Sequence, residues 1–329
     1  MAYDTPSSLI LFVTGVCNAG CQHCFYRSSL NQSDDALGID TLSRLLNSLS
    51  RKCHLSLTGG EPFTRKDIDD IIKEALSCEM VSSLAVNTNA YLTDKINPTL
   101  DKLKNCNKPV YFQLSLDGLK ETHDKNRQLR GCFDRVISIA ERIESLSRDN
   151  PMLSYSLSVT LMKDNLRDVE DMMQFFSREG IKSKITLLRG NSFSSFLIPG
   201  QLMNPEYGPA SAAASEDEIR GLIDRIRMSH PTYLSELNIK KIDLALKILN
   251  AKKRISICHA GDNDGVIYHN GDIGICEQVV PFGNMRNWDW NLYKAWNSDE
   301  ADNHRKQLTK CACIHGCNLS TTIQLGKGG

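Results

Sequence analysis

The chain has 329 residues, of which 41% are hydrophobic and 24% are charged, and this composition is typical of a globular protein with its own core. Lysine plus arginine and aspartate plus glutamate are equal at 39 each, so the formal net charge is zero. Without a basic field, a nucleic-acid partner is not expected. The sequence contains no signal-type N-terminus and no apolar stretch long enough to cross a bilayer. We therefore predict a cytoplasmic protein without a membrane partner.

Strand-like segments alternate with amphipathic helical segments, a pattern that predicts an α/β fold with a parallel sheet. The predicted strands cover 9–14, 54–57, 83–86, 110–116, 154–161 and 184–188. The predicted helices cover 39–49, a segment from Lys66, 133–146, 165–178 with Gly180 as its C-cap, 216–228 and 233–252. Six βα repeats predict a partial (β/α)6 TIM-like barrel that is open on one side. The chemistry of such a barrel lies at the C-terminal ends of its strands.

The chain is expected to divide into three parts. Residues 1–190 form the core barrel. Residues 191–254 begin with a segment rich in Ser, Ala, Pro and Gly, which is interpreted as a loop or lid, and continue as a helical connector. Residues 255–329 are rich in cysteine and poor in apolar residues, so a metal site is expected to organise this small domain.

Twelve cysteines are a high count for a chain without a secretion signal, and their placement favours metal or redox chemistry over disulfides. Three of them lie within eight residues, and five lie in the last quarter of the chain. The remaining four, Cys53, Cys78, Cys106 and Cys132, are isolated and are interpreted as buried apolar side chains.

The first cysteine group has the spacing C-x3-C-x2-C, with Cys17, Cys21 and Cys24 directly after the first predicted strand. Three soft thiolates in one short loop select an iron–sulfur cluster or zinc. His23 lies between two of the cysteines, where chelation of the same metal is awkward. A cubane cluster with only three protein ligands keeps one iron open for another ligand.

This loop, followed by Phe25 and Tyr26, resembles the signature of the radical S-adenosylmethionine (SAM) superfamily. Segments at later strand ends resemble the residues with which that family holds SAM, namely Gly59, Gly60, Glu61 and Pro62, then Asn87 and Asn89, then Ser115, Asp117 and Arg127. The resemblance implies a [4Fe–4S] cluster on the three catalytic cysteines with SAM on the open iron. Reductive cleavage of SAM would give methionine and a 5′-deoxyadenosyl radical that abstracts a substrate hydrogen.

The second cysteine group consists of Cys258, Cys276, Cys311, Cys313 and Cys317. It contains a C-x12-G-x4-C segment, whose glycine, Gly271, is expected in a hairpin turn with a positive φ. The group resembles the Twitch or SPASM auxiliary domains of radical SAM enzymes, and five cysteines rather than seven imply one auxiliary [4Fe–4S] cluster. Its expected ligands are Cys258, Cys276 and Cys317, with Cys313 preferred to Cys311 as the fourth. The leftover thiol is either structural or a hydrogen-atom donor, and a structural zinc site is the alternative for the whole group.

The resemblance therefore implies a radical SAM oxidoreductase that oxidises, epimerises or crosslinks a peptide or a small natural-product precursor. Its expected electron donor is a flavodoxin or ferredoxin, and the auxiliary cluster would assist electron transfer. The alternatives are radical chemistry on nucleotides or RNA, which the neutral charge opposes, and a non-catalytic electron carrier, which has no use for the Gly59–Glu61 segment. Arg189, after the sixth strand, is interpreted either as a binder of a substrate carboxylate or phosphate or as a surface residue.

Overall fold

The structure, a computed structural model, describes residues 2–32, 37–179, 181, 183–204, 210–229 and 234–326. Six parallel strands form the barrel wall, and each lies within a residue or two of its predicted position. They are β1 (Ser8–Thr14), β2 (Cys53–Gly59), β3 (Val81–Thr88), β4 (Val110–Ser115), β5 (Leu153–Leu161) and β6 (Ser183–Leu187). Each strand pairs in parallel with the next along the chain, which confirms the predicted fold class.

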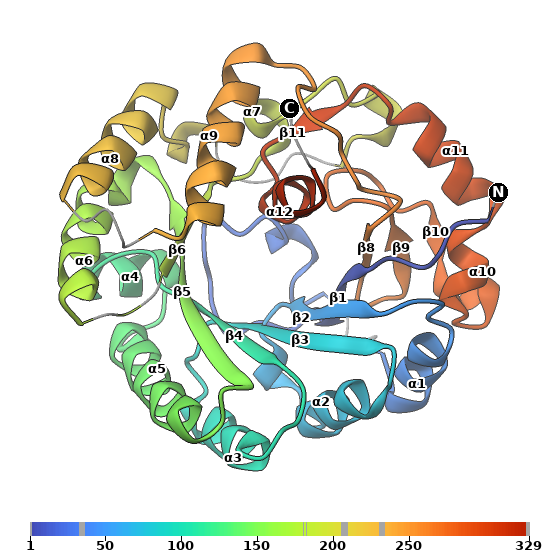
Figure 1. The fold of residues 1–329 in the computed structure, drawn as a ribbon, viewed down its shortest axis with the longest axis horizontal. Coiled ribbons are helices and arrows are strands. Elements are labelled where there is room, and N and C mark those ends of the chain that lie inside the picture. Colours follow the sequence, from blue (N-terminus) through green and yellow to red (C-terminus); the bar gives the residue numbers. More distant parts are fainter. Residues whose placement is uncertain are drawn as a thin grey trace.

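Helices cover the outer face of this curved sheet (Figure 1). They are α1 (Ile39–Asn47), α2 (Ile68–Ser77), α3 (Thr93–Leu103), α4 (Lys120–Arg127), α5 (Cys132–Asp149) and α6 (Leu166–Glu179). Helices α3 and α4 are not among the predicted ones. The interior Pro98 argues against a helix at α3, and α4 buries only His123, so it shows no apolar stripe. Gly180, the predicted C-cap of α6, lies outside the described residues.

The core lies between the sheet and the helices, and the strands alternate between an apolar outer side and a polar inner side. In β2, Leu55 and Leu57 are fully buried in the core, whereas Ser56 between them lines an internal cavity. Each buried leucine of this kind contributes about 1.5–3 kcal/mol to folding. The same alternation places Phe112 of β4 in the core and Gln113 inside the barrel.

The cysteine-rich C-terminal part continues the barrel sheet. Strands β8 (Asp264–Ile267), β9 (Asp272–Gly274) and β10 (Gly283–Asn284) extend it beyond β1 in the order β10-β9-β8-β1, with β8 parallel to β1. The predicted hairpin turn between β8 and β9 is confirmed, and Gly271 has a φ of 90° there. The boundary predicted after residue 254 stays a prediction.

Two helices lie where the six-stranded barrel is open. Helix α9 (Glu236–Ala251) contacts β6, and helix α12 (Gly316–Leu325) contacts both α9 and β8. Figure 1 shows α12 end-on between α9 and β8. The last helix of the chain therefore fills the gap between the two sides of the curved sheet. Helices α8 (Glu216–Ser229), α10 (Leu292–Trp296) and α11 (Asp299–Gln307) complete the outer layer.

The segment predicted as a loop or lid packs, where it is described, against the C-terminal part. Helix α7 (Asn191–Ser194) leads to β7 (Ser195–Phe196), which pairs antiparallel with β11 (Ala312–Cys313). Ile198 and Leu202 are buried. Residues 205–209, the central part of the predicted lid, lie outside the described residues.

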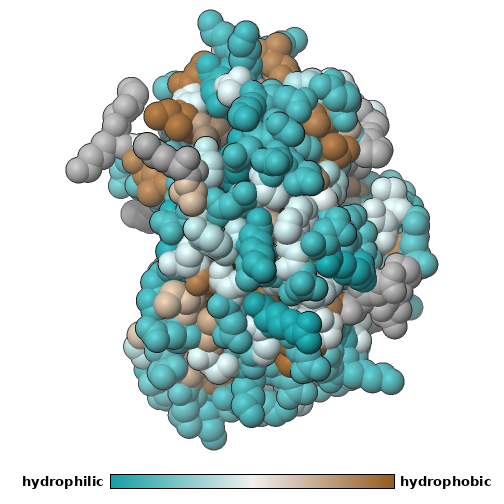
Figure 2. Space-filling model, turned by 90° about the vertical axis from the view of Figure 1, so that its right-hand side faces the viewer, coloured by the Kyte–Doolittle hydropathy of each residue, from teal (hydrophilic) through white to brown (hydrophobic). Residues whose placement is uncertain are grey.

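The surface around α10 and α11 is largely hydrophilic, with hydrophobic residues in small separate groups (Figure 2). Among the described residues, no helix combines the length and the hydropathy that a membrane span requires.

Candidate active site

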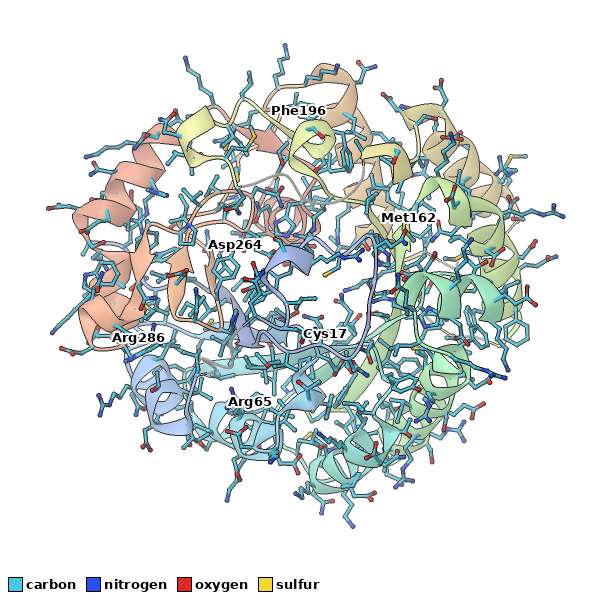
Figure 3. All side chains as sticks on the ribbon, turned by 180° about the vertical axis from the view of Figure 1, so that it is seen from behind. Cys17, Arg65, Met162, Phe196, Asp264 and Arg286 are labelled. Carbon is cyan, nitrogen blue, oxygen red and sulfur yellow. The ribbon has the colours of Figure 1, made fainter. Side chains whose placement is uncertain are left out.

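A cavity of about 360 Å³ lies inside the barrel. Cys17 and the other two cysteines of the loop after β1 line it, together with Glu61 after β2 and Ser115 at the end of β4. The opposite wall comes from α9 and α12, through Lys241 and Cys317. Cys17 lies near the centre of the ring of helices (Figure 3). The cavity therefore joins both cysteine-bearing parts of the chain.

The chain's own hydrogen bonds hold the first cysteine loop. Asn31, with a φ of 58°, accepts a hydrogen bond from the Cys17 N–H (2.9 Å) and donates one to the Cys17 carbonyl (3.2 Å). Its own N–H donates to the Gly15 carbonyl at 2.9 Å, and the Gly20 N–H donates to the Arg127 carbonyl at 3.1 Å. These hydrogen bonds tie the backbone of the loop to Asn31, Gly15 and Arg127.

The three thiols of this loop form a site that fits an iron cluster. Burial raises the pKa of the Cys17 thiol to about 12 and also raises that of Cys24. Such thiols stay neutral at neutral pH unless a cation binds them, so their charge and a metal go together. Arg127 Nη1 lies 3.8 Å from Cys21 Sγ and adds a positive charge beside that sulfur. Three cysteines on one wall match a cluster with three protein ligands.

The two aromatic residues after the cysteines have different positions. Phe25 lines the cavity, and its ring lies under the Arg189 guanidinium, 3.9 Å from the ring centroid. Tyr26 lies outside the lining, with its ring 4.7 Å from that of Phe12 and its hydroxyl 2.8 Å from His269 Nδ1. Burial raises the pKa of Tyr26 above its usual value. Tyr26 therefore ties the cysteine loop to the β8–β9 hairpin.

The glycines after β2 let two backbone segments approach closely. Gly59 has a φ of 130°, and a Cβ on Gly60 would overlap the Val16 carbonyl. The Gly60 N–H donates to the Thr14 carbonyl at 2.9 Å, and the Glu61 N–H donates to the Val16 carbonyl at 2.8 Å. These bonds clamp the end of β2 onto the cysteine loop.

The buried Glu61 carboxylate connects the ends of β2 and β3. It accepts hydrogen bonds from the backbone N–H groups of Phe63 (3.1 Å) and Asn89 (2.7 Å) and from the Thr88 hydroxyl (2.7 Å). Burial raises the pKa of Glu61 to about 7, although these three hydrogen bonds favour the charged form. Glu61 also lines the cavity, whereas the buried Pro62 beside it does not.

Asp117 and Arg127 form a buried ion pair. Arg127 Nε lies 2.7 Å from Asp117 Oδ2, His23 Nε2 lies 3.5 Å from the same oxygen, and the Thr160 N–H donates to Oδ1 at 3.1 Å. Burial by itself raises the pKa of Asp117, but Arg127 and His23 outweigh it and hold the pKa below its usual range. Arg127 lines the cavity and Asp117 does not. Asp117 thus positions the guanidinium that faces Cys21.

The remaining predicted residues are held by side-chain hydrogen bonds. Asn87 Nδ2 donates to Ser56 Oγ at 3.0 Å, and Asn89 Nδ2 donates to Asn18 Oδ1 at 2.8 Å. Of the residues predicted to bind SAM, the structure brings to one cavity Phe25, Gly59, Gly60, Glu61, Asn87, Asn89, Ser115 and Arg127, and it places Tyr26, Pro62 and Asp117 outside the lining. Their contact with SAM stays a prediction.

Four cysteines of the second group surround a smaller cavity of about 50 Å³. Its lining contains Cys258, Cys276, Cys311 and Cys313, but not Cys317, which faces the large cavity. Burial raises the pKa of Cys258 to about 12 and that of Cys313 to about 11, so this group also fits thiolates held by a metal. Cys317 lies in the first turn of α12, which turns its side chain toward the barrel. The predicted ligands Cys258, Cys276 and Cys313 therefore share this cavity with Cys311, whereas the predicted ligand Cys317 lies outside its lining. Which of these thiols bind a metal stays a prediction.

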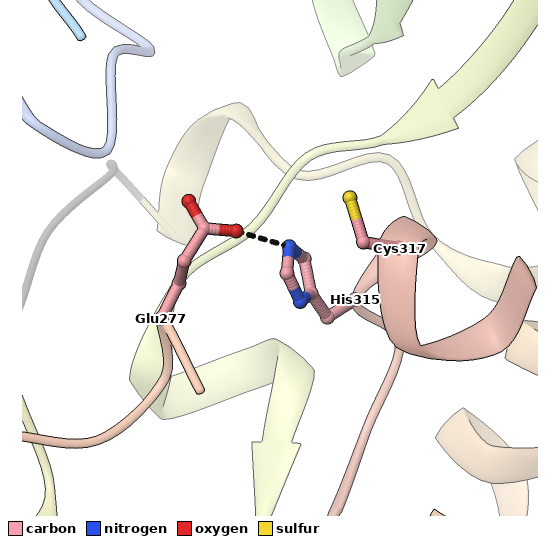
Figure 4. Close-up of side chains that lie close together, drawn as sticks. All are labelled: Glu277, His315 and Cys317. Atoms are coloured by element: carbon pink, nitrogen blue, oxygen red, sulfur yellow. Dashed lines mark ion pairs between the residues drawn. The ribbon is translucent and has the colours of Figure 1, made fainter. Parts of the chain in front are cut away.

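Beside Cys317 lies a buried network of charges. His315 Nε2 is 2.7 Å from Glu277 Oε2 (Figure 4), and Arg189 Nη1 is 3.3 Å from the same oxygen. Although burial favours the neutral acid, Arg189 and His315 lower the pKa of Glu277 to about 2. The ligand atoms of Glu277, His315 and Cys317 lie within 4.8 Å of one another, but the positive charge of Arg189 opposes a cation there. Arg189 therefore both pairs with Glu277 and packs on the Phe25 ring.

A family model described as the radical SAM superfamily matches residues 11–176, about half of the chain. The match begins within β1 and contains the first cysteine loop, the Gly-Gly-Glu segment and the Asp117–Arg127 pair. This chain belongs to the radical SAM superfamily.

The chain is also similar to a curated relative and to two solved structures. Fe-coproporphyrin III synthase of Methanosarcina barkeri (strain Fusaro / DSM 804) is 27% identical over 180 residues, which are 54% of this chain and 43% of that protein. This chain thus spans less than half of that relative's length. SuiB of Streptococcus suis bound to its precursor peptide SuiA has a TM-score of 0.64 at 17% identity, covering 90% of this chain and 65% of SuiB. The anSMEcpe structure with bound AdoMet and Cp18Cys peptide has a TM-score of 0.63 at 17% identity, covering 91% and 82%. At these identities the likeness shows the fold.

Six polar residues that face the interior of this radical SAM barrel were not predicted from the sequence. They are Ser56, Gln113, Ser158, Thr160, Lys184 and Lys241. A signal for the strand residues was present, because β2 and β4 alternate polar and apolar side chains although helices cover their outer face. In a barrel of this kind, the alternation indicates a polar interior.

Proposed function

We propose that this protein cleaves SAM reductively and abstracts a hydrogen atom from an organic substrate bound inside the barrel. The observation that supports this most directly is one cavity shared by the thiols of Cys17, Cys21 and Cys24, the Gly-Gly-Glu segment and the polar barrel interior. Its volume of about 360 Å³ falls within the range of small-molecule sites. A non-catalytic electron carrier would not need such a cavity.

Cys17, Cys21 and Cys24 would hold a [4Fe–4S] cluster. When bound, this cluster would supply the electron that cleaves SAM to methionine and a 5′-deoxyadenosyl radical. The residues of the chain would bind and orient the cluster and SAM. Glu61 lines the cavity and, in its charged form, would attract a positive group of SAM. Arg127 stabilises the Cys21 thiolate by its positive charge. The enclosing helices exclude water from the place where the radical reacts.

In this proposal the second site holds an auxiliary [4Fe–4S] cluster on Cys258, Cys276, Cys311 and Cys313. The support is their common cavity and the raised thiol pKa values of Cys258, Cys311 and Cys313. When bound, that cluster would supply a one-electron acceptor or donor for the reaction. Cys317 is left with a free thiol on the wall of the large cavity. A zinc ion on the same four thiols is the alternative.

We propose a peptide or a small natural-product precursor as substrate, which the enzyme oxidises, epimerises or crosslinks. Peptides are bound in the SuiB and anSMEcpe structures, and Fe-coproporphyrin III synthase is named for a small product. A flavodoxin or ferredoxin donor and a cytoplasmic location belong to the same proposal. The zero net charge speaks against RNA.

The proposal is tested by anaerobic reconstitution with iron and sulfide, followed by incubation with SAM and dithionite. The native protein should form 5′-deoxyadenosine. Replacing all three of Cys17, Cys21 and Cys24 by Ala should abolish it and remove about four irons per chain. Cys106→Ala is the control, because Cys106 is half-buried and lies outside both cavities. Full SAM cleavage by the triple variant would contradict the proposal.

A further inference from the structure

Two lysines in the large cavity form no salt bridge with a carboxylate among the described residues. Lys184 is the second residue of β6, Lys241 belongs to α9, and both line the cavity. Two carboxylates line the cavity, and both are engaged, because Glu61 accepts three hydrogen bonds and Glu277 pairs with His315.

The side chains that Lys184 contacts directly, Gln113 and Tyr111, are neutral. Its ammonium donates a hydrogen bond to the Gln113 side chain and lies 5.5 Å from the centroid of the Tyr111 ring. Burial and, to a smaller extent, the nearby charge of Lys241 lower the pKa of Lys184 to about 8. Burial likewise lowers the pKa of Lys241. Two like charges share a low-dielectric region, which is costly unless a counter-charge joins them.

The ammonium of Lys241 lies at the beginning of α12. A Cβ built on Gly316, the first residue of that helix, would be 3.5 Å from Lys241 Nζ. The N-cap residue His315 makes no side-chain cap, so the first backbone N–H groups of α12 are not satisfied from that side chain. The positive end of the helix dipole therefore adds to the charge of the two lysines.

We propose that Lys184 and Lys241 bind an anionic oxygen group of the substrate, a carboxylate or a phosphate. The inference deepens the proposed function and rests on it, because the bound molecule is the one that the radical attacks. An oxyanion between the two ammoniums would supply the missing counter-charge and would fix the substrate between β6 and α12. Ser158 and Thr160 of β5 line the same cavity and offer neutral hydrogen-bond donors.

Cys317 is the competing partner inside the chain. Its negative form would favour the charged forms of both lysines, since each of them has Cys317 as a nearby group that raises its pKa. If the Cys317 thiolate were the counter-charge, the lysines would need no substrate anion. The replacement Cys317→Ser separates the two explanations.

The first experiment measures how fast acetic anhydride modifies individual lysines of the native reconstituted protein, read by peptide mass spectrometry. We expect inorganic phosphate or glutarate to slow the modification of Lys184 and Lys241 about tenfold, the effect of one charged hydrogen bond. Lys240, which is exposed and pairs with Glu236, is the neighbouring control and should not change. Protection by phosphate alone indicates a phosphate ester, protection by glutarate alone indicates a carboxylate, and protection by both indicates an oxyanion site of either kind.

The proposal is overturned if neither phosphate nor glutarate protects the two lysines. It is also overturned if the lysines are already slow without an anion and become fast in Cys317→Ser, because the thiolate is then their partner. In a second experiment, Lys184→Gln and Lys241→Gln should each weaken binding of the protecting anion about tenfold or more, as measured by protection of the remaining lysine. Lys240→Gln should leave this binding unchanged. Formation of 5′-deoxyadenosine by the native protein tests the proposed function separately, so failure of either idea is recognised by itself.

Discussion

Replacing Asp117 by Asn tests the ion pair that positions Arg127 beside the first cysteine loop. The side chains of Asp117 and Arg127 are 0% and 12% exposed, and their charged atoms are 2.7 Å apart. Asn keeps an acceptor for the Thr160 N–H but removes the negative charge, so the guanidinium stays buried without a counter-ion. Removal of one partner from a buried pair costs about 3–5 kcal/mol, and we expect that loss in the free energy of unfolding.

The assay is urea unfolding of the cluster-free protein, followed by circular dichroism at neutral pH. Asp134→Asn is the matched control, because Asp134 pairs with Lys120 on the surface, where the side chains are 57% and 60% exposed. Loss of an exposed pair costs at most about 1 kcal/mol. Replacing both Asp117 and Arg127 by apolar residues should recover most of the loss, since no charge is then left buried. If Asp117→Asn costs no more than Asp134→Asn, the reasoning about this pair is refuted.

Three further predictions concern other parts of the molecule. Gly60→Ala should cost about 1–3 kcal/mol in unfolding free energy, because its Cβ would overlap a backbone carbonyl of the cysteine loop. Gly38→Ala, with open space around the new Cβ, is the control, and equal losses would speak against the close contact. Cys311→Ser should remove about four irons per chain and Cys317→Ser none; the reverse result would restore Cys317 as a ligand. The pKa of Glu277 is about 2 in the folded protein instead of 4.5. Glu277 therefore contributes about 3 kcal/mol to the free energy of unfolding above pH 4.5, and this contribution is lost as the pH falls toward 2. In Glu277→Gln, the free energy of unfolding should fall less steeply as the pH is lowered from 4.5 toward 2. An unchanged pH dependence would contradict the assigned ion pairs.

The sequence predicted the barrel strands and brought most of the candidate SAM-binding residues to one cavity, because local patterns determine the strand ends. Their contact with SAM stays a prediction. Each strand is a short apolar segment bounded by turn residues, and its C-terminal end must lie at one rim of a parallel sheet. Cys17, Glu61 and Asn87 could therefore be brought together from their places in the strand order alone. Helix α4 was missed because its surface is almost entirely polar, so no apolar stripe indicates it.

The second cysteine site was harder to predict because its geometry depends on contacts distant in the sequence. Cys311, Cys313 and Cys317 lie within seven residues, and spacing does not show that a helix begins between the last two. The pairing of β7 with β11 and the packing of α12 in the barrel gap decide which sulfurs face each other. Lys184 and Lys241 were missed for a related reason, since their neighbourhood exists only after α9 and α12 close the barrel.

The pairing of β8 with β1 has a consequence for how the chain can be divided. Strand β1 has hydrogen-bonded neighbours on both sides, β2 and β8. Cutting the chain before the cysteine-rich part would leave β1 with a row of unpaired backbone groups, an exposed edge of the kind that promotes aggregation. The cysteine-rich part would in turn lose the strand that orders its own hairpin. The barrel and the cysteine-rich part therefore share one continuous sheet, and we expect a cut between them to destabilise both.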